Sequence, residues 1–244
     1  MGWLAVYQRE MMLMRMKVGK FGYVFSTLLF PLIYLLAFGW GLGATIQVDG
    51  GYIAFLAKGM VSITVMMNSF QQTSLSVSVG RFYFRTFQTV ILSPVSPMQI
   101  ILGITLAGVT RGLIAGGVIY GVAMLVFGVP FIDMPGLFGV LFSAICFAAL
   151  GIAVGLSVQS PDALSMVINF IITPMTFFCG SFFPLTNLPE WLQIAVRILP
   201  LSLANELLRV QSWSAQGCVD VSLLLAMSLL MFTLGVYKVK TYSE

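Results

Sequence analysis

The chain has 244 residues, of which 59% are hydrophobic and only 8% are charged, and its mean hydropathy is +1.01. A water-soluble domain of this size cannot bury so much apolar surface, so the composition predicts an all-α protein that crosses a membrane several times. The chain contains no histidine, which removes the commonest general base, proton shuttle and metal ligand.

The first 20 residues are predicted to form an amphipathic helix at the membrane interface. Apolar residues recur at helical spacing (Trp3, Leu4, Tyr7, Met11 and Met14) beside four cations (Arg9, Arg15, Lys17 and Lys20). Such a helix suits the surface of an anionic leaflet. No small-residue cleavage site follows, so the first apolar span is predicted to be an uncleaved helix.

Six apolar segments are long enough to cross a bilayer as helices. The predicted spans are residues 23–43, 52–79, 98–127, 137–158, 163–183 and 221–237. Pro31 is expected to kink the first of them. Glycines recur at four-residue steps in the third span (Gly108, Gly112 and Gly116), with similar pairs at Gly39/Gly43 and Gly151/Gly155. This spacing predicts either a closely packed bundle or a dimer face within one domain, residues 1–244.

The charges are distributed unequally between the two sides of the membrane that six spans define. One side holds both termini and eight cations, against Glu10, Asp162 and Glu244; the other holds five acidic residues (Asp49, Asp133, Glu190, Glu206 and Asp220) against Arg197 and Arg209. The positive-inside rule therefore predicts that both termini are cytoplasmic.

A broken stretch, residues 177–209, lies between the fifth and sixth spans on the predicted outer side. Pro184, Pro189 and Pro200 divide it into pieces too short to cross a bilayer. Asn187 and Glu190 have the spacing of a capping box, which predicts a helix over 188–199. A second amphipathic helix is predicted over 202–210. The pair suggests an element over 184–210 that dips into the interface; a surface loop with helical turns is the alternative.

Residues 80–97 are predicted to lie on the cytoplasmic side between the second and third spans. Arg81 and Arg85 stand one turn apart among four aromatic residues (Phe82, Tyr83, Phe84 and Phe87). An exposed aromatic cluster rimmed by cations is typical of a docking surface. A helix lying on the lipid interface would have the same composition, and both interpretations remain open.

No catalytic or metal-binding pattern is present in the sequence. It lacks HExxH, CxxC, GxSxG and the phosphate-binding GxxxxGK[ST], so ATP, if used, must be bound by another chain. Cys146, Cys179 and Cys218 are predicted to be buried small residues, with a 179–218 bridge as an alternative. No carboxylate falls clearly within a span, which argues against an ion-coupled carrier.

A few polar residues do fall near or within predicted spans. Arg111 either attracts anions along a path, or it snorkels or is satisfied by carbonyls, and the sequence does not decide between these interpretations. Lys58 is predicted to snorkel to the outer interface. Asn68, Gln71 and Gln72 either line a polar seam or form hydrogen bonds between helices.

The whole chain resembles the membrane subunit of type-2 ABC exporters, the family of drug, nodulation-factor and polysaccharide export permeases. Residues 52–60, YIAFLAKGM, are similar to the family's Y-x-x-F-L-x-P-G pattern, with Lys58 in place of the usual proline. LSPVS at 92–96 precedes the third span. The most specific match is FP at 183–184, NLP at 187–189, WL at 191–192 and LP at 199–200, continuing to Arg209.

The resemblance implies two permease copies with two ATP-binding subunits that hold the ATP and Mg, in a bacterial inner membrane. Residues 80–93 would be a coupling helix seated on the ATPase (Arg81, Phe84, Arg85 and Phe87), and residues 1–20 an interfacial connecting helix beside it. The broken stretch would be an outer gate formed by re-entrant half-helices (Phe183, Pro184, Asn187, Pro189, Trp191, Pro200, Glu206 and Arg209).

These observations favour a non-enzymatic permease subunit that exports an amphipathic, lipid-linked or drug-like molecule, with candidate path residues Asn68, Gln71, Gln72 and Arg111. We expect no cofactor or metal on this chain, membrane lipid as a contact, and no nucleic-acid partner. The alternatives are a passive channel and a membrane scaffold that does not transport.

Overall fold

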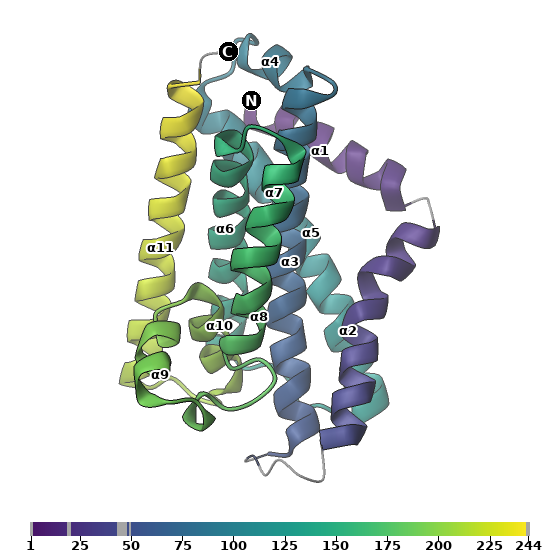
Figure 1. The fold of residues 1–244 in the computed structure, drawn as a ribbon, viewed down its shortest axis with the longest axis vertical. Helices are drawn as coiled ribbons and strands as arrows, with labels where there is room; N and C mark the ends of the chain where they lie inside the picture. The colour runs from purple at the N-terminus through teal and green to yellow at the C-terminus, as the bar shows by residue number, and fades with distance from the viewer. Residues whose placement is uncertain (1, 19–20, 43–47, 49, 243–244) are drawn as a thin grey trace.

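The computed structural model describes residues 2–18, 21–42, 48 and 50–242 of the chain. Lys20, Gly43, Asp49 and Glu244, which entered the predictions above, lie outside these residues. The regular structure of the described part is helical throughout, and Figure 1 labels the helices α1 to α11. The helices are α1 (Gly2–Val18), α2 (Phe21–Leu42), α3 (Tyr52–Phe82), α4 (Thr86–Ile91), α5 (Pro97–Phe127), α6 (Met134–Ser157), α7 (Pro161–Val167), α8 (Thr173–Phe178), α9 (Glu190–Arg197), α10 (Pro200–Arg209) and α11 (Ala215–Lys240).

Five helical segments of the described chain are long and apolar enough to cross a membrane. They are α3, α5, α6, α11 and the continuous segment from α7 to α8. Helix α2 adds a shorter apolar stretch, Leu29–Gly39, among its described residues. The prediction of an all-α protein that crosses the membrane several times is confirmed.

The fifth span ends five residues earlier than predicted. It consists of α7, a π-helical turn (Ile168–Ile172) and α8, and it stops at Phe178 rather than at residue 183. The Thr173 hydroxyl donates to the Ile168 carbonyl at 3.1 Å, across the widened turn. Wide turns of this kind are rare and mark places where a helix is bent or adapted.

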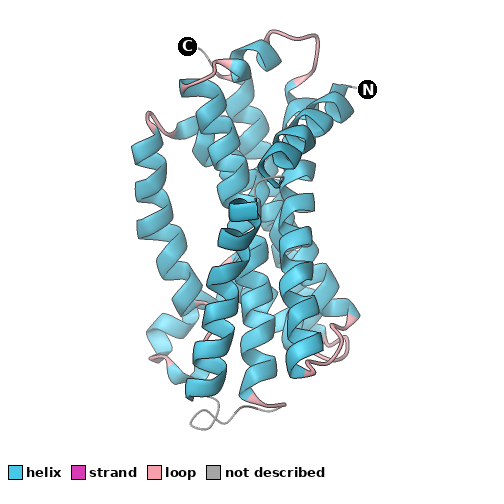
Figure 2. Ribbon diagram, turned by 90° about the vertical axis from the view of Figure 1, so that its right-hand side faces the viewer, coloured by secondary structure: helices cyan, strands magenta, loops and turns pink. Residues whose placement is uncertain are grey.

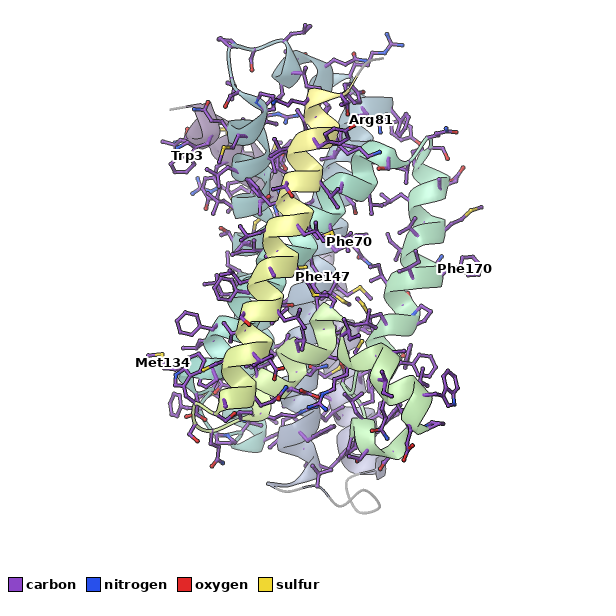
Figure 3. The ribbon with its side chains drawn as sticks, turned by 90° about the vertical axis from the view of Figure 1, so that its left-hand side faces the viewer. Trp3, Phe70, Arg81, Met134, Phe147 and Phe170 are labelled. Carbon is purple, nitrogen blue, oxygen red and sulfur yellow. The ribbon has the colours of Figure 1, made fainter. Side chains whose placement is uncertain are left out.

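Helix α3 forms the centre of the bundle, and glycines let its neighbours approach it closely. A Cβ on Gly112 or Gly108 of α5 would collide with Ser69 or Thr73 of α3, and one on Gly151 of α6 would collide with the Phe70 carbonyl. The four-residue glycine ladder therefore packs α5 against α3 within the chain. Phe70 and Phe147 lie inside this core, whereas Phe170 points away from the bundle (Figure 3).

The bundle has two distinct ends. Both termini, α1 and α4 lie near one end, and α9 and α10 lie at the other (Figure 1). The view turned by 90° shows the same separation, with the long helices running between the ends (Figure 2). We refer to these as the α4 end and the α9 end.

Candidate functional site: the two ends of the bundle

A protruding corner at the α4 end presents aromatic and cationic side chains. Helix α3 continues to Phe82, past its predicted end, and the chain turns through residues 83–85 into the six-residue α4. Tyr83 is 69% exposed, Phe84 is 71% exposed, and Arg85 is also exposed. Arg85 adopts a left-handed φ of 50°, which is costly for a residue with a Cβ. The predicted coupling helix over 80–93 is thus a helix end, a tight turn and a short helix.

Arg81 is tied into the protein on the inner side of this corner. Its Nη1 donates to the carbonyls of Gly155, Leu156 and Val158 at 3.0, 2.9 and 3.1 Å, which are acceptors freed by the end of α6. Its Nε donates to the Tyr242 hydroxyl at 3.1 Å. Arg81 therefore joins α3, α6 and the end of α11.

Phe87, the fourth predicted coupling residue, lies in the interior. Its side chain is 2% exposed, and its ring meets Tyr242 edge to face with centroids 5.7 Å apart. The ring supports the corner from beneath rather than presenting a surface. Of the four residues, Phe84 and Arg85 are the exposed ones.

Helix α1 packs against the bundle through a buried ion pair. Arg111 Nη2 of α5 lies 3.2 Å from Glu10 Oε2, and it also donates to the Glu10 carbonyl. Glu10 is 2% exposed and also accepts from the Ser76 hydroxyl at 2.8 Å. A Cβ on Gly103 of α5 would meet the Trp3 carbonyl, so the backbones are in close contact. The face of α1 that contacts the bundle includes Glu10, which periodicity alone did not select.

The two cations near the predicted spans are both buried. Arg111 is 7% exposed, and its Nη2 pairs with the Glu10 carboxylate of α1, a partner that neither interpretation of the sequence considered. Lys58 is 8% exposed, so it lies inside the protein rather than along its outer surface. Lys58 lies in the first third of α3, the most buried helix among the five candidate spans.

The three amides of α3 lie on its partly exposed side but do not converge. Asn68 Nδ2 donates to the Thr64 carbonyl at 2.9 Å, one turn back in the same helix. Gln71 Nε2 lies 3.3 Å from the Met67 sulfur. Gln72 lines a cavity together with Arg111. Only this last pair of candidate path residues is brought together.

The α9 end begins differently from the capping box that the sequence predicted. Asn187 belongs to a single 3-10 turn, and α9 starts at Glu190 with Pro189 before it and no side-chain cap. Gln193 Nε2 instead donates to the Leu188 carbonyl at 2.7 Å. Trp191 is 72% exposed, so α9 carries a large apolar side chain on its outer face.

Helix α10 (Pro200–Arg209) is largely buried and holds the polar groups of this end. Arg209 lies over the Phe55 ring of α3, with its Cζ 3.5 Å from the ring centroid. Burial lowers the pKa of the Arg209 guanidinium to about 9, which still leaves it charged at neutral pH. Burial raises the pKa of Glu206, while Arg197, 3.7 Å away, opposes that rise. Asn205 Nδ2 donates to the Cys179 carbonyl at 2.9 Å.

The start of α3 forms the other half of the α9 end. The Tyr52 hydroxyl donates to the Phe182 carbonyl at 2.9 Å, and a Cβ on Gly59 would collide with the Ser181 carbonyl. Tyr52, Phe55 and Gly59, three positions of the family-like 52–60 pattern, thus contact the broken stretch at Ser181, Phe182 and Arg209. Phe183 and Pro184 follow this contact as partly buried residues. Sequence reasoning missed Asn205 and Ser181, which lack any distinctive pattern.

The cysteines of the described chain are free, so the 179–218 bridge is absent. Cys146 and Cys179 are buried, as predicted, whereas Cys218 is exposed. Among the described residues, no group of three or more Cys, Asp or Glu is placed to hold a metal ion. The contacts described at the two ends anchor short elements to the long helices.

The bundle of candidate membrane-spanning helices, with an exposed corner at one end and two short amphipathic helices at the other, is the architecture of a polytopic helical membrane protein. Residues 2–212 match the model of the ABC-2 type transporter family, and the chain belongs to that family. It is 32% identical to Nodulation protein J of Rhizobium leguminosarum bv. trifolii, over 86% of this chain and 80% of that protein.

Two other relatives show the same likeness. Nodulation protein J of Sinorhizobium fredii is 27% identical, over 96% of this chain and 91% of its own. Inner membrane transport permease YadH of Escherichia coli is 29% identical, over 69% and 67%. The chain is therefore a multi-pass membrane permease subunit of the ABC-2 type.

Proposed function

We propose that this chain is the transmembrane half of an ATP-driven exporter in a bacterial inner membrane. Membership of the ABC-2 type transporter family carries the proposal. The sequence contains no phosphate-binding GxxxxGK[ST] pattern, which supports placing ATP and Mg on a separate subunit. Two such subunits and a second permease copy would complete the transporter.

The corner formed by Tyr83, Phe84 and Arg85 supports an ATPase contact at the α4 end. Large exposed aromatic rings next to a cation are enriched at the centres of protein interfaces. The corner is also braced from inside by Arg81 and Phe87, so a push on its surface would be transmitted to α3, α6 and α11. Arg81 and Phe87 are then positioning residues, and Phe84 and Arg85 are the contact residues.

The α9 end is proposed to face outward and to close the path of the cargo. The broken stretch is attached to α3 by Tyr52 and Arg209, so movement of α3 would move it. The resemblance implies that the path would lie between two permease copies and be lined in part by the fifth span. The 80% exposed Phe170 and the 60% exposed Ile171 form part of an apolar surface suited to lipid or to that second copy. An amphipathic, lipid-linked or drug-like cargo fits such apolar surroundings.

The proposal is tested by reconstituting the chain in vesicles with its P-loop ATPase and measuring ATP hydrolysis. Phe84→Ala and Arg85→Gly should each lower the permease-dependent part of hydrolysis several-fold, because each removes a contact side chain. Glycine also relieves the left-handed φ at position 85, so loss of folding does not explain a loss in that variant. Leu125→Ala, at a 90% exposed position far from the corner, is the matched control.

Unchanged hydrolysis in both corner variants would refute the docking surface. A passive channel would instead give cargo flux without any ATPase present, and a scaffold would give neither flux nor stimulated hydrolysis.

A further inference from the structure

A cavity of about 360 Å³ lies at the α4 end, between α1, α3, α4 and α5. Apolar side chains form most of its wall, among them Leu13, Met14, Leu75 and Phe84. Among the described residues that line it, the charged ones are two arginines, Arg9 and Arg111. A mainly apolar cavity with a few convergent polar groups is the usual form of a small-molecule site.

One of these arginines has an unused donor. Arg111 is 7% exposed, and its Nε has no hydrogen-bond partner among the described residues. A buried donor without a partner is costly, and it becomes satisfied when an acceptor fills the cavity. The Glu10 carboxylate is already engaged by Arg111, Ser76 and, at 3.4 Å, Arg9. It compensates one of the two positive charges and leaves the cavity cationic.

We propose that this cavity binds an amphiphile with an anionic headgroup of the phosphate or carboxylate class. The headgroup would accept from Arg111 Nε and from Arg9, whose side chain is 33% exposed. The apolar tail would lie along Leu13, Met14 and Leu75. Charge-assisted hydrogen bonds of this kind select an anion over a zwitterion or a neutral head. The inference concerns a single chain and holds whether or not the chain transports this ligand.

The experiment is a lipid titration of the full chain in a neutral detergent, followed by native mass spectrometry. Phosphatidylglycerol and phosphatidylcholine with identical acyl chains are compared. We expect phosphatidylglycerol to bind about tenfold more tightly, the effect of one charge-assisted hydrogen bond. Inorganic phosphate, which offers the headgroup without the tail, is expected to give no bound species at the same concentrations.

Two variants and a matched control locate the site. Arg9→Gln should remove most of the preference for phosphatidylglycerol, whereas Arg15→Gln, the same change at an exposed position of the same helix, should keep it. Leu75→Trp, which fills the cavity without altering charge, should weaken binding of both lipids.

Three results would each overturn the proposal. Equal binding of the two lipids by the unmodified chain would show that the headgroup is not recognised. Equal losses in Arg9→Gln and Arg15→Gln would assign the effect to general surface charge. Retention of inorganic phosphate as strongly as of lipid would make the ligand a free anion rather than an amphiphile.

Discussion

At Gly59 the backbone of α3 lies directly against the backbone of the broken stretch. Any Cβ there would overlap the Ser181 carbonyl, which is backbone and cannot rotate away. Glycine is therefore required by the approach of two backbones and not by a special φ. Gly112 likewise allows α5 to approach α3, because a Cβ at this position would collide with the Ser69 hydroxyl.

Gly59→Ala is expected to destabilise the protein by about 1–3 kcal/mol, the usual cost of overpacking a well-filled contact. Gly117→Ala is the control, because a Cβ at that position of α5 meets nothing within 4 Å. Thermal unfolding of the purified protein in detergent measures both. A Gly59→Ala protein as stable as the Gly117→Ala protein would contradict the close approach.

The buried Glu10–Arg111 ion pair is a second contact between individual residues that is expected to affect stability strongly. Removing one partner of a buried ion pair leaves a charge without compensation, whereas removing both can be nearly neutral. Glu10→Leu is thus expected to cost about 3–5 kcal/mol. The double variant Glu10→Leu, Arg111→Met should recover a large part of that loss. Additive losses in a double-mutant cycle of thermal stability would show that the two side chains do not interact.

At the scale of elements, the short pieces are held by the long helices. Helix α4 has six residues, too few to be stable alone, and it is fixed by Phe87 beneath it and Thr86 beside it. Arg9 Nη2 of α1 donates to the Thr86 hydroxyl at 2.9 Å. Helix α1 is therefore connected directly to α4, next to the corner, and a movement of one would displace the other.

Arg81 connects two helices, because its guanidinium donates hydrogen bonds to the backbone carbonyls that are left free at the end of α6. Arg81→Ala should destabilise the protein by about 1–3 kcal/mol through the loss of hydrogen bonds from a charged donor. It should also speed amide hydrogen exchange over residues 154–162. Arg85→Ala, at an exposed neighbouring position, should leave exchange there unchanged. Equal rates of amide hydrogen exchange over residues 154–162 in the two variants would show that Arg81 does not stabilise the end of α6.

At the scale of the whole molecule, the two ends differ in what they expose. The α4 end exposes the corner of Tyr83, Phe84 and Arg85, and the free thiol of Cys218 is exposed near the α9 end at the start of α11. The other two cysteines are buried. The chain thus carries a natural reporter of its orientation in the membrane.

If both termini are cytoplasmic, a membrane-impermeant maleimide should label Cys218 in intact spheroplasts, and Cys218→Ser should abolish the signal. A thiol introduced by Leu92→Cys, at an 86% exposed position of the α4 end, should react only after permeabilisation. The opposite pattern of labelling would invert the predicted topology.

Much of this architecture follows from local sequence. Apolar segments of about twenty residues require helices in a membrane, because their backbone groups have no other partners there. Ser96, Ser160 and Ser214 cap the starts of α5, α7 and α11, so these helices begin where a local signal places them. The prolines at 184, 189 and 200 likewise divide the broken stretch where the structure divides it.

The sequence by itself thus determined the helical class, the order of the spans, the broken stretch and the resemblance to a permease family. Only the tertiary structure decided the partner of Arg111, the burial of Lys58 and Phe87, the anchoring role of Arg81 and the use of the glycine ladder inside one chain. Each of these depends on residues from helices far apart in sequence. Periodicity describes which face of a helix is apolar, but it does not say which helix that face will meet.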